Sequence, residues 1–317
     1  MGWRDILVTG TTGFIGTELL PLLRERGYRV FSLERYVTGR IGKARQPTDD
    51  LWFADLKDVF SLTKVIQKIQ PDIVIHLGAI TSVDYSYRHP QEVLETNFIG
   101  TVNLAELCRR YIPNFQQFIF ASTAEVYGVC GEQVKDETLT NLQPNSPYSV
   151  SKYSSEKYLH YLQKAYNLPV TIFRMFNSYG RKRDNFFVVE KIIDQMLHED
   201  ICHLGDPEPV RDFLYYPDQL NAYLSALENP SSIGETFNVC SGVGISIKGL
   251  TDKISRLTNF SGELIWRSMP RRPLDIMHLV GSNEKIHRIL GVPKPVSLED
   301  GLKKTIDWWR NEVYYDS

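Results

Sequence analysis

The stretch ILVTGTTGFIG, residues 6–16, places three glycines in a Gly-x-x-Gly-x-x-Gly spacing directly after a short apolar run. That run is typical of a strand, and residues 17–26 are typical of a helix. Glycines at such a turn permit a tight bend and let backbone N–H groups approach a pyrophosphate at the helix N-terminus. An ordinary strand–helix turn is the alternative, because the commoner spacing is Gly-x-Gly-x-x-Gly. We interpret the stretch as a dinucleotide-binding loop with contacts from Gly10, Thr12, Gly13, Phe14, Ile15 and Gly16.

Strand-like and helix-like segments alternate through the first half of the chain. Further strands are predicted at 28–33, 73–77, 117–121 and 170–174, and helices at 62–69, 93–111 and 148–166. Short β-branched runs between helical patterns indicate a parallel sheet covered on both faces. Beyond residue 177, prolines separate short elements, which indicates a smaller irregular lobe. We therefore predict an α/β fold with a nucleotide-binding domain over 1–176 and a lobe over 177–317, some segments of which return to the sheet.

Composition narrows the possible functions. The 317 residues include 36 Lys and Arg against 38 Asp and Glu, without a basic stripe for nucleic acid. No apolar run reaches the ~18 residues of a membrane span. The four cysteines are scattered without a Cys-x-x-Cys pair, and the start of the chain leads directly into a strand. We expect reduced cysteines, a cytoplasmic location and no metal site.

The residues after the second and later strands favour particular cofactor contacts. Glu34 ends the second strand about 20 positions beyond the loop, where a carboxylate accepts ribose hydroxyls of NAD. Arg35 is placed to meet the 2′-phosphate of NADP instead, so NAD is favoured over NADP without excluding it. Asp55 and Leu56 follow a short strand and are candidates for the adenine, although an Asp that only ends a strand is the alternative.

A second group of cofactor candidates ends the strand at 73–77. Small residues there let a cofactor lie against the backbone, and the candidates are Leu77, Gly78 and Ala79. His76 is interpreted as a core histidine, because no cluster of metal-binding residues accompanies it.

Tyr148 and Lys152 are four residues apart in a predicted helix, which places both side chains on one face. A neighbouring ammonium favours the phenolate and lowers the pKa of a tyrosine from its reference value of about 10. We expect Tyr148 to act as a base near neutral pH. Together with a dinucleotide loop, the pair predicts hydride chemistry on an alcohol.

These motifs resemble the extended short-chain dehydrogenases/reductases that act on nucleotide sugars, a group of epimerases, dehydratases, decarboxylases and reductases. The resemblance covers essentially the whole chain and includes the phrases at 76–81, 97–101, 121–128, 174–180, 209–213 and 271–275. The phrases at 237–242 and 279–283 look closest to the GDP-mannose 4,6-dehydratase and GDP-4-keto-6-deoxymannose reductase branch. The resemblance implies a Rossmann-type doubly wound parallel sheet with a smaller C-terminal lobe that binds the substrate.

The resemblance also implies catalytic roles. Tyr148 takes the proton of the sugar 4-hydroxyl, Lys152 holds the nicotinamide ribose, and Thr123 hydrogen-bonds the same 4-hydroxyl. Glu125 is the candidate base at carbon 5, whose proton becomes acidic once carbon 4 is oxidised. Dehydratases of the group carry Asp or Ser before that Glu. Ala124 stands there in this chain and donates no proton, which weakens a dehydratase interpretation.

Further contacts are implied by position in the family. Asn97 and Ser122 are expected to bind the cofactor, and Thr81 and Asn177 the substrate. Arg211 and Arg272 match positions that grip the diphosphate, where guanidinium groups form paired hydrogen bonds with phosphate oxygens. A surface ion pair of Arg211 with Asp212 or Asp206 is the alternative. The resemblance implies that the 148–166 helix joins the 93–111 helix in a dimeric four-helix bundle. Aromatic residues on the 148–166 helix favour such a homodimer over a monomer with an aromatic surface.

We therefore predict an NAD-dependent enzyme that transiently oxidises carbon 4 of a nucleotide sugar, specifically a 4,6-dehydratase, which is a lyase. A nucleotide-sugar 4-epimerase and an NADPH-dependent 4-keto-sugar reductase are the alternatives. A non-catalytic dinucleotide sensor is a fourth possibility, disfavoured by the presence of Thr123, Tyr148 and Lys152 together. The sequence does not identify the nucleotide base or the sugar.

Overall fold

The computed structural model describes residues 4–35, 50–182, 185–269 and 272–312. Seven strands form the main sheet, in the order β10-β6-β5-β4-β1-β2-β3. Their bounds are β1 Asp5–Thr9, β2 Arg29–Glu34, β3 Leu51–Phe53, β4 Ile73–His76, β5 Gln117–Thr123, β6 Val170–Met175 and β10 Thr236–Val239. Neighbouring strands from β3 through β5 pair in parallel. The strand order reverses between β1 and β4, so the carboxyl ends of these two strands form the topological switch point where open α/β sheets bind ligands.

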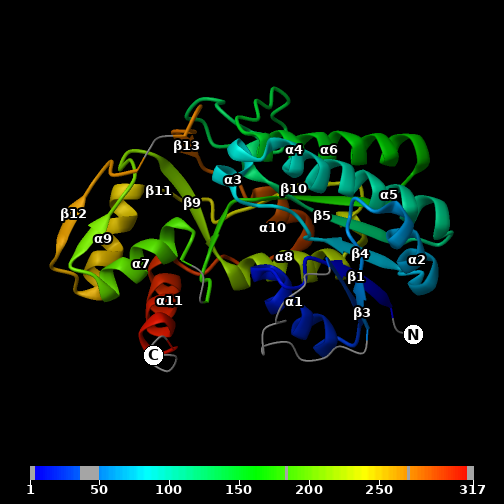
Figure 1. Ribbon diagram of the computed structural model, residues 1–317, viewed down its shortest axis with the longest axis horizontal. Coiled ribbons are helices and arrows are strands. Elements are labelled where there is room, and N and C mark those ends of the chain that lie inside the picture. Colours follow the sequence, from blue (N-terminus) through cyan, green and yellow to red (C-terminus); the bar gives the residue numbers. More distant parts are fainter. Residues whose placement is uncertain (1–3, 36–49, 183–184, 270–271, 313–317) are drawn as a thin grey trace. The chain divides into compact units, whose positions relative to one another are not determined.

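Helices cover both faces of this sheet, as Figure 1 shows. The helices α2 Val59–Ile69, α5 Gly100–Tyr111 and α6 Pro147–Tyr166 lie over one face, and α1 Phe14–Glu25 lies over the other. Apolar side chains of α2, α5 and α6 pack with those of the strands in one buried cluster that includes Leu62, Leu104, Leu159 and Phe118. The predicted α/β class and Rossmann-type sheet are confirmed.

The predicted helix at 93–111 contains an irregular segment. The structure has α4 Pro90–Val93, then a π-helix η1 Leu94–Ile99, then α5. The short helix α3 Val83–Arg88 precedes them, and a 3₁₀ helix of one turn, η2 Ala124–Val126, follows β5. A π-helical turn widens the helix by one residue and changes which side chains face the sheet. The expectation of one regular helix is therefore wrong in its first turns.

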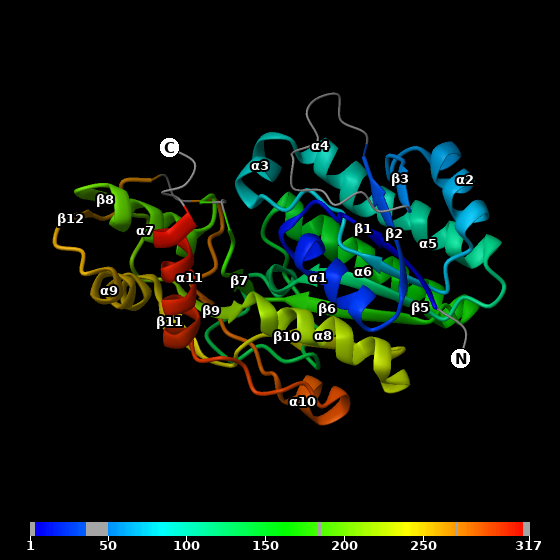
Figure 2. The same cartoon turned by 90° about the horizontal axis from the view of Figure 1, so that it is seen from below.

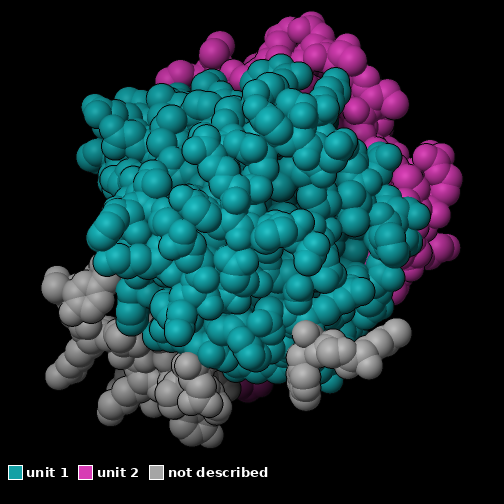
Figure 3. All heavy atoms as spheres, turned by 90° about the vertical axis from the view of Figure 1, so that its right-hand side faces the viewer, with its two compact units in different colours: residues 1–126, 146–174, 226–236 teal, residues 127–145, 175–225, 237–317 magenta. Residues whose placement is uncertain are grey.

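The chain divides into two compact units, coloured teal and magenta in Figure 3. The first comprises residues 1–126, 146–174 and 226–236, and the second comprises 127–145, 175–225 and 237–317. Each unit is thus assembled from separate chain segments. The boundary expected at residue 176 stays a prediction.

The second unit has its own sheets and core. The strand order β11-β9-β13, with β7 paired to β9, uses β7 Asn177–Tyr179, β9 Val210–Tyr215, β11 Gly244–Ser246 and β13 His278–Leu279. A separate pair joins β8 Ile201–His203 to β12 Glu263–Ile265. The helices are α7 Val188–His198, α8 Tyr216–Glu228, η3 Pro230–Ser232, α9 Ile247–Thr258, α10 Glu284–Leu290 and α11 Leu298–Glu312. Helices α7, α9 and α11 lie beside β8 and β12 and enclose a second apolar cluster (Figures 1 and 2).

Candidate active site

The glycine loop lies where the carboxyl ends of β1 and β4 meet. Gly10 has φ +72°, and a Cβ there would lie 2.8 Å from the Gly78 nitrogen. A Cβ on Gly16 would lie 2.7 Å from the Thr11 Cα. Both positions therefore exclude larger residues, and helix α1 begins at Phe14, which places its N-terminus at the loop. The structure brings the predicted contacts of residues 10–16 and Gly78 together at this point.

Glu34 is held at the same loop. The Thr11 hydroxyl donates a 2.5 Å hydrogen bond to Glu34 Oε1, and the Glu34 side chain is buried. Arg35, the next residue, is exposed. The sequence prediction did not include Thr11 among the site residues, although its position between two loop glycines is the signal that it lies there.

The two adenine candidates have structural contacts of their own. Asp55 Oδ1 accepts a 2.9 Å hydrogen bond from the Lys57 backbone N–H, as in an ordinary turn. Leu56 packs on the main core, and a Cβ on Gly100 would lie 2.7 Å from the Leu56 Cβ. Their contacts with the cofactor stay predictions.

His76 is the centre of a buried polar chain. Thr9 Oγ1 accepts a hydrogen bond from the Gly78 N–H at 2.9 Å and lies 2.7 Å from His76 Nδ1. The Thr101 hydroxyl donates its single proton to the Asn97 carbonyl at 2.5 Å and therefore accepts from His76 Nε2 at 3.0 Å, which leaves Nδ1 of the neutral ring to accept the proton of Thr9. Burial, aided by the positive charge of Lys152, lowers the pKa of His76 to about 3. The neutral ring ties β1, β4 and α5 together beneath Gly78.

Asn97 lies in the π-helical turn, and its side chain is buried. Its amide oxygen accepts from the Ile80 N–H at 2.8 Å, and its Nδ2 donates to the Ile80 carbonyl and to Ser151 Oγ. These bonds use both the oxygen and the nitrogen of the Asn97 amide and fix the backbone at Ile80. Thr81, which follows Ile80, is exposed. A direct contact of Asn97 with the cofactor stays a prediction.

The predicted catalytic residues lie together in the first unit. Ser146 begins α6 with a capping box to Ser149, which places Tyr148 in the first helical turn. The Thr123 side chain lies near the Tyr148 phenol, where it favours the ionised form, and the Glu125 N–H donates to Thr123 Oγ1 at 3.2 Å. Tyr148 and Thr123 are buried, whereas Glu125 is half-buried.

The expected effect of Lys152 on Tyr148 is not observed. Lys152 Nζ donates a 2.7 Å hydrogen bond to the Ala121 carbonyl and lies 4.8 Å from the centre of the Phe120 ring. Burial, and next the Glu125 carboxylate, raise the pKa of Tyr148, while the Thr123 side chain opposes them. Burial also lowers the pKa of Lys152 to about 7, against the opposing effect of Glu156. The predicted lowering of the Tyr148 pKa is therefore wrong for this structure, because the dominant influence is the loss of water around the phenol.

Two residues near this site were missed from the sequence. Glu156 is buried one helical turn beyond Lys152, and it accepts a 2.5 Å hydrogen bond from Ser122 Oγ and two from Arg174. The Ser122 side chain thus points to Glu156, and its expected cofactor contact stays a prediction. The spacing Tyr-x-x-x-Lys-x-x-x-Glu was the available signal.

The predicted phosphate contacts lie in the second unit. Arg211 Nη2 donates to Asp275 Oδ1 at 3.3 Å, while Asp212 accepts from the backbone of Ser241 and Gly242 instead. Arg211 therefore has an acidic partner, Asp275. Arg272 is exposed, and Asn177 Nδ2 is 3.4 Å from the Asp212 carbonyl. Their roles with a substrate stay predictions.

Residues 7–305 match the model of the family described as GDP-mannose 4,6 dehydratase. The chain belongs to this family. It is 31% identical to a protein of Methanocaldococcus jannaschii named putative UDP-glucose 4-epimerase, over 96% of this chain and 98% of that protein. It is 30% identical to the dTDP-D-glucose 4,6-dehydratase of Mus musculus, over 98% of this chain and 90% of that protein.

Solved structures show the same architecture. The UDP-glucose 4-epimerase of Thermotoga maritima, solved with UDP-glucose, has a TM-score of 0.89 at 32% identity and covers 98% of this chain and 100% of its own. The UDP-glucose 4-epimerase of Thermus thermophilus, solved with NAD, has a TM-score of 0.88 at 29% identity with the same coverage. The predicted membership of the nucleotide-sugar epimerase and dehydratase group is confirmed. Among the described helices, none is long and apolar enough to cross a membrane.

Proposed function

We propose that this protein is an NAD-dependent nucleotide-sugar 4,6-dehydratase. The observation that carries the proposal is the buried pair of hydroxyl side chains, Thr123 and Tyr148, with the Glu125 carboxylate close enough to raise the pKa of Tyr148. A hydroxyl pair with an adjacent carboxylate fits oxidation at one carbon followed by proton removal at the next.

The loop fits a dinucleotide. Gly10 and Gly16 leave room only for backbone, the N-terminus of α1 lies at the loop, and Glu34 is held for ribose hydroxyls. NAD, when bound, supplies the acceptor for the hydride of carbon 4. The carboxylate of Glu34 disfavours the 2′-phosphate of NADP.

The protein residues then handle protons. Tyr148 must first lose its own proton, and its phenolate then accepts the proton of the 4-hydroxyl as the C4–H bond breaks, while Thr123 orients that hydroxyl. Glu125 removes the carbon 5 proton and returns a proton to the 6-hydroxyl, which leaves as water. One carboxylate can do both, because a base that has gained a proton is an acid. Hydride return to carbon 6 and a proton at carbon 5 complete a 4-keto-6-deoxy sugar without net redox change.

A 4-epimerase is the second candidate, and two observations favour it. Ala124 donates no proton to a leaving hydroxyl. Proteins named UDP-glucose 4-epimerase are among the relatives at 29–32% identity. An epimerase returns the hydride to the other face of carbon 4 and never breaks the C5–H bond.

Solvent deuterium distinguishes the two reactions. UDP-, GDP-, dTDP- and CDP-hexoses are incubated with the enzyme in deuterated water, and the products are followed by NMR. A dehydratase places deuterium at carbon 5 and forms a 6-deoxy product. A product inverted at carbon 4, without deuterium and with its 6-hydroxyl intact, identifies the epimerase.

The Glu125→Gln variant sharpens this experiment. It is expected to stop deuterium exchange while the sugar still reduces bound NAD, since that step uses Tyr148. Because the Glu125 carboxylate raises the pKa of Tyr148, removing it should move the acid limb of NAD reduction to lower pH. Unchanged exchange in this variant excludes Glu125 as the carbon 5 base.

We also propose that Arg211 and Arg272 bind the substrate diphosphate and that Thr81 and Asn177 contact the sugar nucleotide. Arg211 is mostly buried and already holds one carboxylate, Asp275, which supports a preference for anions. Four free cysteines, three of them buried, support a cytoplasmic location.

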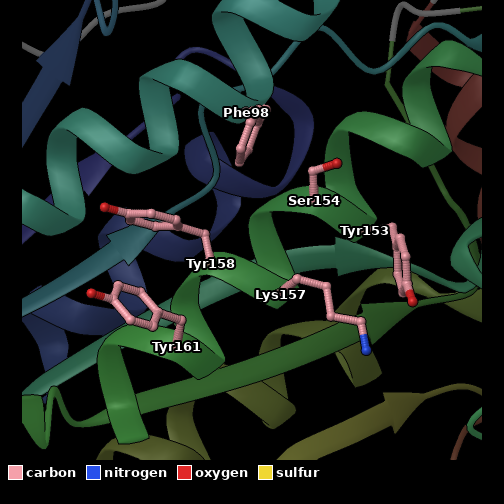
Figure 4. A pocket seen from close by; sticks show the side chains of 6 residues that line it. All are labelled: Phe98, Tyr153, Ser154, Lys157, Tyr158 and Tyr161. Atoms are coloured by element: carbon pink, nitrogen blue, oxygen red, sulfur yellow. The ribbon is translucent and has the colours of Figure 1, made fainter. Parts of the chain in front are cut away.

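We further propose that the protein forms a homodimer through α5 and α6. Figure 4 shows a hollow beside α5, lined by Phe98 of η1 and by five residues of α6: Tyr153, Ser154, Lys157, Tyr158 and Tyr161. Ile99, Val150 and Tyr161 are exposed nearby on η1 and α6. Helix faces of this composition usually mark interfaces, and sedimentation equilibrium measures the oligomeric state.

A further inference from the structure

Helix α6 presents three functional side chains to strand β5 at successive turns. Tyr148, Lys152 and Glu156 are spaced by four residues and therefore share one helix face. Lys152 Nζ donates to the Ala121 carbonyl, Glu156 accepts from Ser122, and Tyr148 lies near Thr123. Three consecutive residues at the end of β5 are thus each faced by one side chain of this helix face, two of them through hydrogen bonds.

Glu156 is the most strongly anchored of the three. Arg174 on β6 donates from Nε to Oε1 at 3.1 Å and from Nη2 to Oε2 at 2.8 Å, in the two-pronged geometry of a bidentate pair. Glu156 is 1% exposed and Arg174 is 5% exposed. The carboxylate therefore joins α6 to two neighbouring strands, β5 and β6.

Glu156 is also the acidic group that counters the burial of Lys152. The ionisable groups around Lys152 are Tyr148 and Glu156 on α6 and His76 on β4, with Arg174 on β6 and Glu125 on η2 one step further out. His76 is neutral, and Tyr148 keeps its proton because its pKa is raised. The Glu156 carboxylate raises the pKa of Lys152 against the effect of burial, which lowers it.

We propose that Glu156, clamped by Arg174, is a positioning residue that holds the Tyr148–Lys152 face of α6 in register with β5 and keeps Lys152 charged. This rests on the proposed function, because a charged Lys152 is what holds the nicotinamide ribose. An uncharged Lys152 would have one proton fewer to donate and no attraction for the cofactor's oxygens. Arg174 keeps the buried carboxylate ionised, since an unpaired buried carboxylate would take up a proton.

The test measures the titration of Lys152 directly. Lysines labelled with ¹³C at Cε are followed by NMR against pH, and the Lys152 signal is assigned by its loss in Lys152→Arg. Glu156→Gln is expected to lower the pKa of Lys152 below that of the wild-type protein, and Glu156→Asp to keep it close to wild type. Glu190→Gln is the matched control, because Glu190 is equally buried near an arginine and is not among the groups that affect Lys152.

The Glu156→Gln substitution alone leaves Arg174 buried without its acidic partner and is expected to reduce the stability of the protein. If Glu156→Gln does not fold, the double variant Glu156→Gln/Arg174→Met removes both charges. The pKa of Lys152 must again fall, because the Glu156 carboxylate that raises this pKa is absent. An unchanged Lys152 titration in whichever of the two variants folds overturns the proposal.

The consequence for catalysis is measured separately. With a nucleotide sugar that reduces bound NAD, the alkaline limb of that reduction should move to lower pH in Glu156→Gln. Turnover should fall by up to about 100-fold from misplacement of the reacting groups, with partial recovery in Glu156→Asp. A loss of turnover without any movement of the limb indicates a structural role only and contradicts the proposal. If no sugar reduces NAD, the proposed function fails, while the lysine titration still tests the role of Glu156.

Discussion

The hydrogen bond from Thr11 to Glu34 predicts how strongly the chain prefers NAD. Thr11→Val keeps the branched shape of the side chain and removes its only donor. Thr11 is 5% exposed and Glu34 is 8% exposed, so water replaces little of the lost bond. A hydrogen bond to a charged group contributes about 1.5–3 kcal/mol, which corresponds to roughly 10- to 150-fold in a binding constant.

We expect Thr11→Val to weaken NAD binding by about tenfold, at the lower end of this range. The reason is that part of the lost energy appears as reduced stability of the loop and not as reduced affinity. NADP binding should not weaken in parallel, because a displaced Glu34 repels the 2′-phosphate less. The preference for NAD over NADP should therefore fall by at least the same factor.

Isothermal titration calorimetry with NAD and NADP measures both affinities. Thr11→Ser keeps the hydroxyl and is the control, expected to bind NAD nearly as the wild-type protein does. Far-UV circular dichroism confirms that each variant is folded. If Thr11→Val binds NAD within twofold of wild type at an unchanged NAD to NADP ratio, Thr11 does not position Glu34 for the cofactor.

Two further predictions concern Tyr148 and His76. Tyr148→Phe should reduce turnover by roughly 10²- to 10⁴-fold while NAD still binds, as measured by steady-state kinetics and calorimetry, and near-normal turnover would remove Tyr148 from proton transfer. His76 should stay neutral with its proton on Nε2, giving a ¹H–¹⁵N signal that does not change between pH 5 and 8, whereas a titration near pH 6.5 would contradict the buried network. Because the folded pKa of about 3 lies below the ordinary 6.5, the unfolded chain binds the extra proton between these values. The His76 contribution to stability therefore falls as pH falls through that window, and urea titrations should show a weaker pH dependence for His76→Gln.

Short sequence patterns predict the elements whose stabilising contacts lie within one segment of the chain. The apolar run, the glycines and the following helix at residues 6–25 all lie within one segment, and the capped start of α6 does as well. The π-helical turn at Leu94–Ile99 was not predictable in this way. Its centre, Asn97, bonds Ile80 and Ser151, which are 17 and 54 residues away. A tertiary contact therefore sets the local geometry.

The same limit explains the errors at the site. Four-residue spacing correctly places Tyr148 and Lys152 on one face, but it does not show that Lys152 reaches the Ala121 carbonyl, 31 residues away. Nor does spacing give burial, which decides the direction of the Tyr148 pKa. The ion pair of Glu156 with Arg174 depends on the packing of α6 against β6 and was missed for that reason.

The pairing of β6 with β10 in the main sheet has a consequence for synthesis on the ribosome. Strand β6 ends at Met175, but its neighbour β10 begins only at Thr236, some 60 residues later. At about 5–20 residues per second, the ribosome needs roughly 3–12 s to supply that partner. During this interval the β-branched edge Val170, Thr171 and Ile172 has unpaired N–H and C=O groups, which favour association with other nascent chains. The nascent protein is therefore most in need of chaperone protection between the emergence of β6 and that of β10.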